Sequence, residues 1–213
     1  MFSKPVGVTV GNEDEDDEYG KLESYFAWMM FMHTLILGDS DAGKTWLVLN
    51  ILLHEYSPFL PAYEKIVVIG TEADDLWHKL ALRLDPDKFL MFPDIDARIF
   101  AGMANRKNKK LWLVIVDDKI GKIREFTRMI DITRCRNKQE EDPCCHVWML
   151  IQYYMKIPAD FRAQFKNVLV LQSFAANKKL IDRLIEDGFF GFSKYPEVRA
   201  LCEAATGKPG AIL

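Results

Sequence analysis

The stretch LILGDSDAGKTWLVLNILL, residues 35–53, constrains the fold of this chain more than any other segment. Three apolar residues lead into a loop bounded by two glycines, and an apolar helical pattern begins at Thr45. A strand that passes through a tight loop directly into a helix is typical of sheets whose parallel strands are covered by helices. This stretch therefore predicts an α/β fold.

The remaining apolar runs support the same fold, because they are rich in β-branched residues and lack the alternation of half-exposed strands. The predicted strands are residues 32–37, 65–70, 111–118, 146–152 and 167–173, with a weaker one at 87–92. The predicted helices are residues 45–56, 74–84, 120–134 and 177–190. Strands that alternate with helices predict a three-layer sandwich with a mostly parallel central sheet.

The loop itself matches the phosphate-binding pattern G-x-x-x-x-G-K-[ST]. Its residues are Gly38, Asp39, Ser40, Asp41, Ala42, Gly43, Lys44 and Thr45. In this setting, loop amides and the helix N-terminus point at phosphates, Lys44 reaches the β- and γ-phosphate oxygens, and the Thr45 hydroxyl binds Mg²⁺. The predicted fold is accordingly a P-loop NTPase sandwich of the ASCE or RecA-like type.

Two aspartates in the loop, Asp39 and Asp41, oppose the binding of a polyphosphate. A carboxylate a few ångströms from a phosphate costs on the order of 1 kcal/mol in a solvated loop. Because backbone amides form the cradle, these side chains are free to face outward, and aspartate tolerates a left-handed backbone at Asp41. We expect the loop to bind nucleotide, more weakly than a neutral loop.

An acid pair and a glutamine follow two other predicted strands. Asp117 is expected to hold the water shell of Mg²⁺, and Asp118 to orient and polarise the attacking water; the alternative is a cap for the helix at 120–134. Gln152 is expected to sense the γ-phosphate or the water, unless it only hydrogen-bonds a turn. An acid beside the metal ligand favours hydrolysis, and the lack of an NKxD signature favours ATP over GTP.

These motifs, in this order, resemble the genome-packaging ATPases of the FtsK–HerA superfamily, in the branch of nucleocytoplasmic large DNA viruses and virophages. The matching pieces are GDSDAGKT, LWLVIVDD, the arginine-rich ITRCRNKQ, and a strand-end Gln152 followed by Pro158, Arg162 and a strand from Asn167. The resemblance covers roughly residues 30–190. It departs from the family at Asp41, where glycine is common, and at the Arg-Cys-Arg segment.

The resemblance implies a motor that hydrolyses ATP and drives double-stranded DNA, without reading its sequence, into a preformed capsid. It also implies a pentameric or hexameric ring, capsid or vertex proteins as partners, and a neighbour's arginine that completes each site. Arg162 is the first candidate for that arginine, with Arg134 and Arg136 next; any of them is alternatively a surface cation. The implied location is the host cytoplasm, in a viral factory, with the virion as a second location.

A basic segment, NRKNKK at 105–110, is the candidate DNA contact. Its cations are Arg106, Lys107, Lys109 and Lys110, which would bind phosphates without reading sequence. A solvated basic turn is the alternative. The net charge is −3, of which six consecutive acids at 13–18 account for −6, so the other residues carry +3. A charge of +3 is a weak indication of DNA binding in a monomer. Five or six copies of it around the pore of a ring would bind DNA more strongly.

The chain is expected to comprise an acidic, flexible arm (1–24), an ATPase domain (25–202) and a tail (203–213). The arm is alternatively a docking or DNA-mimicking segment. The apolar run at 25–37 is shorter than the roughly 20 residues of a membrane span, so we expect no membrane anchor. No secretion signal precedes it. The group Cys144-Cys145-His146, with Cys135, lacks the paired spacing of a zinc site.

Two other functions stay open at the level of sequence. One is another P-loop enzyme such as a nucleic-acid kinase, since RNA polynucleotide kinases tolerate aspartate at the position of Asp41. The other is an assembly scaffold that binds nucleotide without turnover.

Overall fold

A six-stranded parallel sheet forms the centre of the computed structural model, which describes residues 33–53, 63–70, 75–96, 98–99, 111–117, 145–171, 177–189 and 200. The strands are β1 (Thr34–Leu37), β2 (Tyr63–Ile69), β3 (Phe89–Phe92), β4 (Leu111–Asp117), β5 (Cys145–Ile151) and β6 (Asn167–Val170). The helices are α2 (Lys44–Leu53), α3 (Asp75–Ala81), η2 (Tyr154–Lys156), α6 (Ala159–Arg162) and α8 (Lys178–Glu186). All six predicted strands are confirmed, including the weak one at 87–92.

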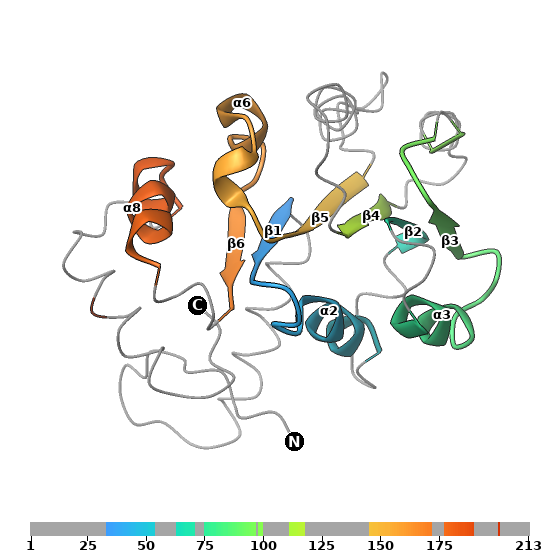
Figure 1. The fold of residues 1–213 in the computed structure, drawn as a ribbon. Helices are drawn as coiled ribbons and strands as arrows, with labels where there is room; N and C mark the ends of the chain where they lie inside the picture. The colour runs from blue at the N-terminus through green and yellow to red at the C-terminus, as the bar shows by residue number, and fades with distance from the viewer. Residues whose placement is uncertain are drawn as a thin grey trace, which may run out of the picture.

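The order of the strands across the sheet is β3-β2-β4-β5-β1-β6 (Figure 1). The glycine loop follows β1 and the predicted acid pair begins in β4, and β5 lies between these two strands. One strand thus separates the strand that leads into the glycine loop from the strand that ends in Asp117. Since all the strand pairs are parallel, their carboxyl ends lie at the same edge of the sheet.

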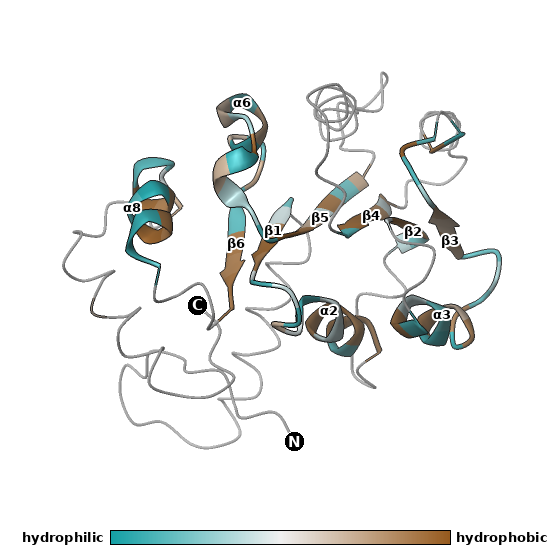
Figure 2. Cartoon of the chain, viewed as in Figure 1, coloured by the Kyte–Doolittle hydropathy of each residue, from teal (hydrophilic) through white to brown (hydrophobic). Residues whose placement is uncertain are grey.

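Helices cover both faces of the sheet, which gives the predicted three layers (Figure 1). On β4, Leu113 and Ile115 pack in one apolar cluster with side chains of α2 and α3, and Val114 and Val116 pack in another with side chains of η2, α6 and α8. Because successive side chains of a strand point to opposite faces, a strand in this position is apolar throughout. Figure 2 shows this pattern, with apolar strands and helices that are apolar on one side.

Helices α3 and α8 each bury the apolar residues of one side. In α3 the fully buried side chains are Trp77 and Leu80, whereas Leu76, and Leu84 beyond the end of the helix, are half-buried. In α8 the buried residues are Leu180, Ile181 and Leu184. Helix α3 is therefore oriented so that its largest apolar side chain, Trp77, faces the core. Helix α8 begins at an Asn177 cap, whose side chain accepts a hydrogen bond from the Leu180 amide.

The structure describes none of the predicted helix at 120–134 and only part of the apolar run at 25–37. Within the described part of the chain, no helix has the length and apolar character that crossing a membrane requires.

Candidate nucleotide site

The glycine loop, residues 38–45, connects β1 to α2 in a conformation with two left-handed residues. Gly43 has φ +88° and Asp41 has φ 60°. Glycine adopts such a φ without strain, and aspartate is among the few other residues that adopt it often. The side chains of Asp39 and Asp41 are both exposed. The loop therefore has the backbone at Asp41 and the exposed aspartates that the sequence predicted.

Lys44 is buried although it carries a charge, with only 6% of its surface exposed. Its Nζ atom donates hydrogen bonds to the main-chain oxygens of Gly38, at 3.1 Å, and of Asp39, at 2.7 Å. Among the residues that the structure describes, no carboxylate forms an ion pair with this ammonium. The ammonium is thus held over the loop by dipoles alone, and an incoming phosphate would supply the opposite charge.

Thr45 and Asp117 meet although 72 residues separate them in the sequence. The Thr45 hydroxyl, in the first turn of α2, donates to Asp117 Oδ2 at 3.2 Å. The carboxylate of Asp117 is at the end of β4, and the residue is 6% exposed. A hydroxyl and a carboxylate are the hard oxygen ligands that Mg²⁺ prefers. The pair therefore fits the predicted magnesium site.

Two neighbours that the sequence analysis did not single out shape the position of Asp117. A Cβ atom at Gly70, which follows β2, would lie 2.7 Å from the Asp117 carbonyl oxygen, so only glycine allows this close approach. The Trp77 indole Nε1 donates a hydrogen bond to Asp117 Oδ2 at 2.8 Å. The sequence shows no link between positions 77 and 117, because the contact depends on how α3 packs on the sheet.

Gln152 lies at the same edge of the sheet, directly after β5. In the sheet Ile151 is in register with Leu37 of β1, and Leu150 with Asp117 of β4. The Gly38 amide donates to the Ile151 carbonyl at 3.2 Å, which brings the start of the loop beside Gln152. The topology therefore brings the loop, Asp117 and Gln152 together at one edge of the sheet, as the sequence predicts. Whether Gln152 senses phosphate stays a prediction.

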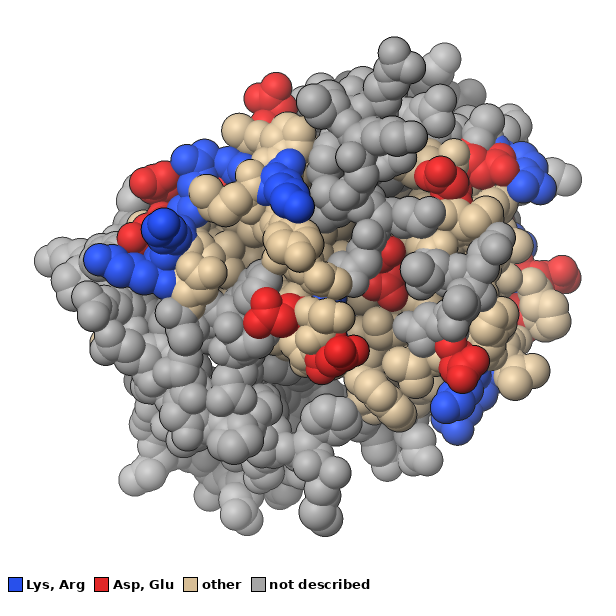
Figure 3. All heavy atoms as spheres, viewed as in Figure 1, with Lys and Arg blue, Asp and Glu red and all other residues tan. Residues whose placement is uncertain are grey.

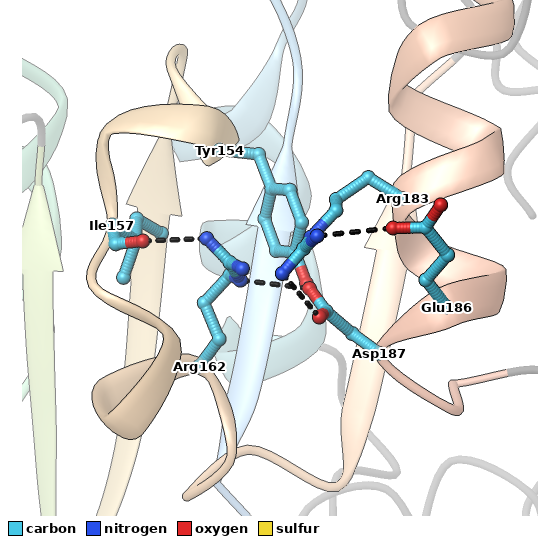
Figure 4. A network of polar contacts seen from close by, with 6 residues as sticks. All are labelled: Tyr154, Ile157, Arg162, Arg183, Glu186 and Asp187. Carbon is cyan, nitrogen blue, oxygen red and sulfur yellow. Dashed lines mark hydrogen bonds and ion pairs between the residues drawn. The ribbon is translucent and has the colours of Figure 1, made fainter.

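Arg162, the first candidate for an arginine that acts in a neighbouring subunit, lies inside the protein (Figure 4). Its Nη1 donates to the Ile157 carbonyl at 2.6 Å. Its Nε lies 2.7 Å from Asp187 Oδ2, an ion pair whose N–H is not aligned for a hydrogen bond. The guanidinium also lies 5.1 Å from the centre of the Tyr154 ring, and the Tyr154 hydroxyl donates to Asp187 at 2.5 Å. This geometry favours an internal, structural role; the role between subunits stays a prediction.

The charge of Asp187 is stabilised by that network. Burial alone would raise the pKa of Asp187, but the hydrogen bond from Tyr154, the close contact with the Arg162 guanidinium and the charges of Arg162 and Arg183 lower it below the usual aspartate value. For Tyr154, burial and then the bond to Asp187 raise the pKa of the hydroxyl, which stays protonated as a donor. The network therefore joins η2, α6 and the end of α8 through one ionised carboxylate.

Several predicted site residues lie outside the described residues. They are Asp118, Arg134, Arg136, Arg106, Lys107, Lys109 and Lys110. On the face that Figure 3 shows, one group of described lysines and arginines lies over α6 and α8 with acids among them, and other cations lie at the opposite side of the view. The candidate DNA contact therefore stays a prediction from sequence.

The Cys-His pair at the start of β5 packs into the core. Cys145 is buried, and His146 Nδ1 lies 3.2 Å from the hydroxyl of Tyr63, which is also buried. Nearby, His33 Nδ1 accepts the Val147 amide at 3.0 Å. The described residues contain no group of three or more metal-ligating side chains. Cys135 and Cys144 lie outside them.

Among the comparisons with known proteins, only the comparison of structures gives matches. No family model and no curated protein matches the sequence. The genome packaging NTPase B204 from Sulfolobus turreted icosahedral virus 2, in complex with AMP, has a TM-score of 0.49 at 12% identity, over 76% of this chain and 84% of that one.

The crystal structure of B204, described as the DNA-packaging ATPase of Sulfolobus Turreted Icosahedral Virus, has a TM-score of 0.47 at 10% identity, over 84% and 88% of the two chains. EccC (ATPases 2 and 3) of Thermomonospora curvata has a TM-score of 0.31 at 16% identity, over 74% of this chain and 28% of that one. At such low similarity we base the function on the residues of the site.

Proposed function

We propose that this chain is a Mg²⁺-dependent ATPase that drives double-stranded DNA into a preformed viral capsid. The observation that carries the ATPase is the contact between the Thr45 hydroxyl and the Asp117 carboxylate, beside the buried Lys44. Two distant segments place there a hydroxyl, a carboxylate and a cation without a carboxylate partner among the described residues, which is the set of groups that a metal-bound polyphosphate requires.

In the proposed reaction Lys44 leaves the carbonyls of its own loop and binds the β- and γ-phosphate oxygens. Thr45 and Asp117 hold the metal, which when bound neutralises charge that develops on the phosphates. Asp118, the residue after β4, orients the attacking water, and Gln152 contacts that water or the γ-phosphate. Each of these groups approaches from the carboxyl edge of the sheet.

The step from an ATPase to a DNA motor rests on the resemblance of the segment from Gln152 through Pro158 to Arg162 to packaging ATPases. We infer a homo-oligomeric ring, in the host cytoplasm and the virion, whose pore contacts DNA phosphates and which docks on capsid or vertex proteins. The segment 105–110 is the proposed DNA contact, and Arg134 and Arg136 are the proposed arginines in trans. Arg162 would have to leave its ion pair with Asp187 to act in that way.

The test is ATP turnover with and without long duplex DNA, on protein whose assembly state is measured in parallel. A motor is expected to release inorganic phosphate faster when DNA is added. A ring that assembles and hydrolyses ATP at the same rate with and without DNA contradicts the motor. Transfer of the γ-phosphate to a nucleic-acid end would instead identify the kinase.

A further inference from the structure

Trp77 contacts the nucleotide site from the helix layer behind the sheet. It belongs to α3, none of its surface is exposed, and its Nε1 donates to Asp117 Oδ2 at 2.8 Å. The same oxygen accepts the Thr45 hydroxyl at 3.2 Å. One carboxylate oxygen of Asp117 is therefore held by two donors, one from α2 and one from α3.

The indole is a more rigid donor than the hydroxyl. Trp77 packs in the apolar cluster between the sheet and α2, with Val48, Leu49 and Leu52. A large side chain enclosed in this way has one accessible rotamer, so its N–H has one direction. A hydrogen bond to an ionised carboxylate is roughly twice as strong as one between neutral groups. The direction of the indole therefore restricts the rotation of the Asp117 carboxylate.

Other buried tryptophans show that this core holds an indole without giving its N–H a partner. Trp148 is 2% exposed and belongs to the same apolar cluster as Trp77, and Trp112 is 6% exposed on the other face. The Nε1 atoms of both have no hydrogen-bond partner among the described residues. At those two positions the indole only packs in the core. The hydrogen bond from Trp77 to Asp117 is therefore not a general consequence of burying a tryptophan here.

We propose that Trp77 is a positioning residue for the metal site, whose indole N–H holds the Asp117 carboxylate in the orientation that Mg²⁺ with a nucleotide requires. The inference rests on the proposed function, since it assigns Asp117 to the metal. Groups that orient a metal ligand in this way typically alter metal affinity by about 10- to 100-fold when they are removed.

The test compares Trp77→Phe with Trp148→Phe, two buried indoles of one cluster of which one donates to Asp117. The affinity for a nonhydrolysable ATP analogue is measured by calorimetry across a series of Mg²⁺ concentrations and in EDTA. We expect Trp77→Phe to raise the Mg²⁺ concentration for half-maximal tight binding about tenfold, with the affinity in EDTA unchanged. Trp148→Phe is expected to change neither quantity.

A second measurement follows the metal response of the wild-type protein itself. The indole N–H signals of the five tryptophans are followed by NMR while Mg²⁺ is added to the complex with the analogue. The Trp77 signal, identified by its absence in Trp77→Phe or by selective labelling, is expected to shift with metal, and the Trp148 signal to shift less.

Three outcomes separate this inference from the proposed function. Equal Mg²⁺ dependence in Trp77→Phe and wild type, or a Trp77 signal that does not respond to metal, overturns the role of Trp77 and leaves the ATPase in place. A loss of binding in EDTA as large as the loss in Mg²⁺ also overturns it, since the loop itself is then damaged. A wild-type protein that binds no nucleotide with Mg²⁺ overturns the ATPase and the inference together.

Discussion

Two buried cations, Lys44 and Arg162, are equally hidden from solvent and differ in what surrounds their charge. Each is 6% exposed. Lys44 contacts only main-chain oxygens among the described groups, whereas Arg162 has a carboxylate, a carbonyl and an aromatic ring around it. Burying a charge is costly unless a partner of opposite charge is present. Arg162 has its partner within the fold, whereas the described residues supply no anionic partner for Lys44, a place that a phosphate would take.

This difference separates a binding site from a structural one without reference to any relative. A cation whose charge is compensated internally stabilises the protein in which it lies. A cation that is held only by carbonyl oxygens forms a stronger interaction when a phosphate replaces those oxygens as the hydrogen-bond acceptor. We therefore place the function at Lys44 and assign Arg162, in the arrangement described, to joining η2, α6 and α8.

The largest effect is expected from breaking the compensated pair. Arg162→Met removes the guanidinium from Asp187 and from the face of the Tyr154 ring, so that Asp187 keeps only the more exposed Arg183 as a cationic partner. This should lower the free energy of unfolding by about 3 kcal/mol. Urea denaturation measures this, with Arg98→Met as the control, because the Arg98–Asp96 pair is exposed and should contribute less than about 1 kcal/mol. A variant of Arg162 that keeps wild-type stability and loses turnover would identify the arginine in trans instead.

Lys44→Met should have the opposite pattern. Removing a buried ammonium that has no carboxylate partner is expected to leave the free energy of unfolding unchanged or higher. ATP turnover should fall by about 100-fold or more, since a cation that stabilises transition-state charge is lost. Phosphate release per folded molecule measures this, with the exposed Lys156→Met as the control. Turnover within threefold of wild type would exclude Lys44 from the chemistry.

The pH dependence of stability tests the network around Asp187. Because its pKa is lowered in the folded protein, ionised Asp187 stabilises the fold above the unfolded aspartate pKa of about 3.9, and that stabilisation disappears as pH falls through the lower folded value. The stability difference between wild type and Asp187→Asn should therefore be constant above about pH 5 and shrink below about pH 4. Asp160→Asn, at an exposed site, is the control; a constant difference down to pH 2 would contradict the account.

The smallest effect is expected at Asp41, on the loop that holds Lys44. Asp41→Asn removes the charge and keeps a residue that tolerates φ 60°. Asp41→Gly also removes any backbone strain. If the charge weakens binding, both should raise ATP affinity about fivefold, which corresponds to roughly 1 kcal/mol. Calorimetry with the nonhydrolysable analogue measures this, and affinity equal to wild type in both would show that the carboxylate has no influence.

Much of the fold and half of the site follow from local sequence. Runs such as 111–118 are apolar without alternation, and the glycine pattern fixes the loop, so the strands and the convergence of the loop with Asp117 at one edge of the sheet were predictable. The short η2 and α6 were not, because they have too few residues to show a period. Neither the Trp77 contact nor the Arg162 network was predictable, since both depend on tertiary packing between distant segments. The role of Arg162 between subunits is predicted from a motif. A motif does not indicate whether the fold places a carboxylate such as Asp187 beside the arginine.

The central claim, that the charge of Lys44 is compensated by a ligand, is tested most directly by ligand-induced stability. The free energy of urea unfolding is measured for wild type and Lys44→Met, each with and without Mg²⁺ and the nonhydrolysable ATP analogue. At a ligand concentration 100 times the wild-type Kd, wild type should gain about 2.7 kcal/mol and Lys44→Met less than about 0.5 kcal/mol. Equal gains in the two proteins would contradict the claim.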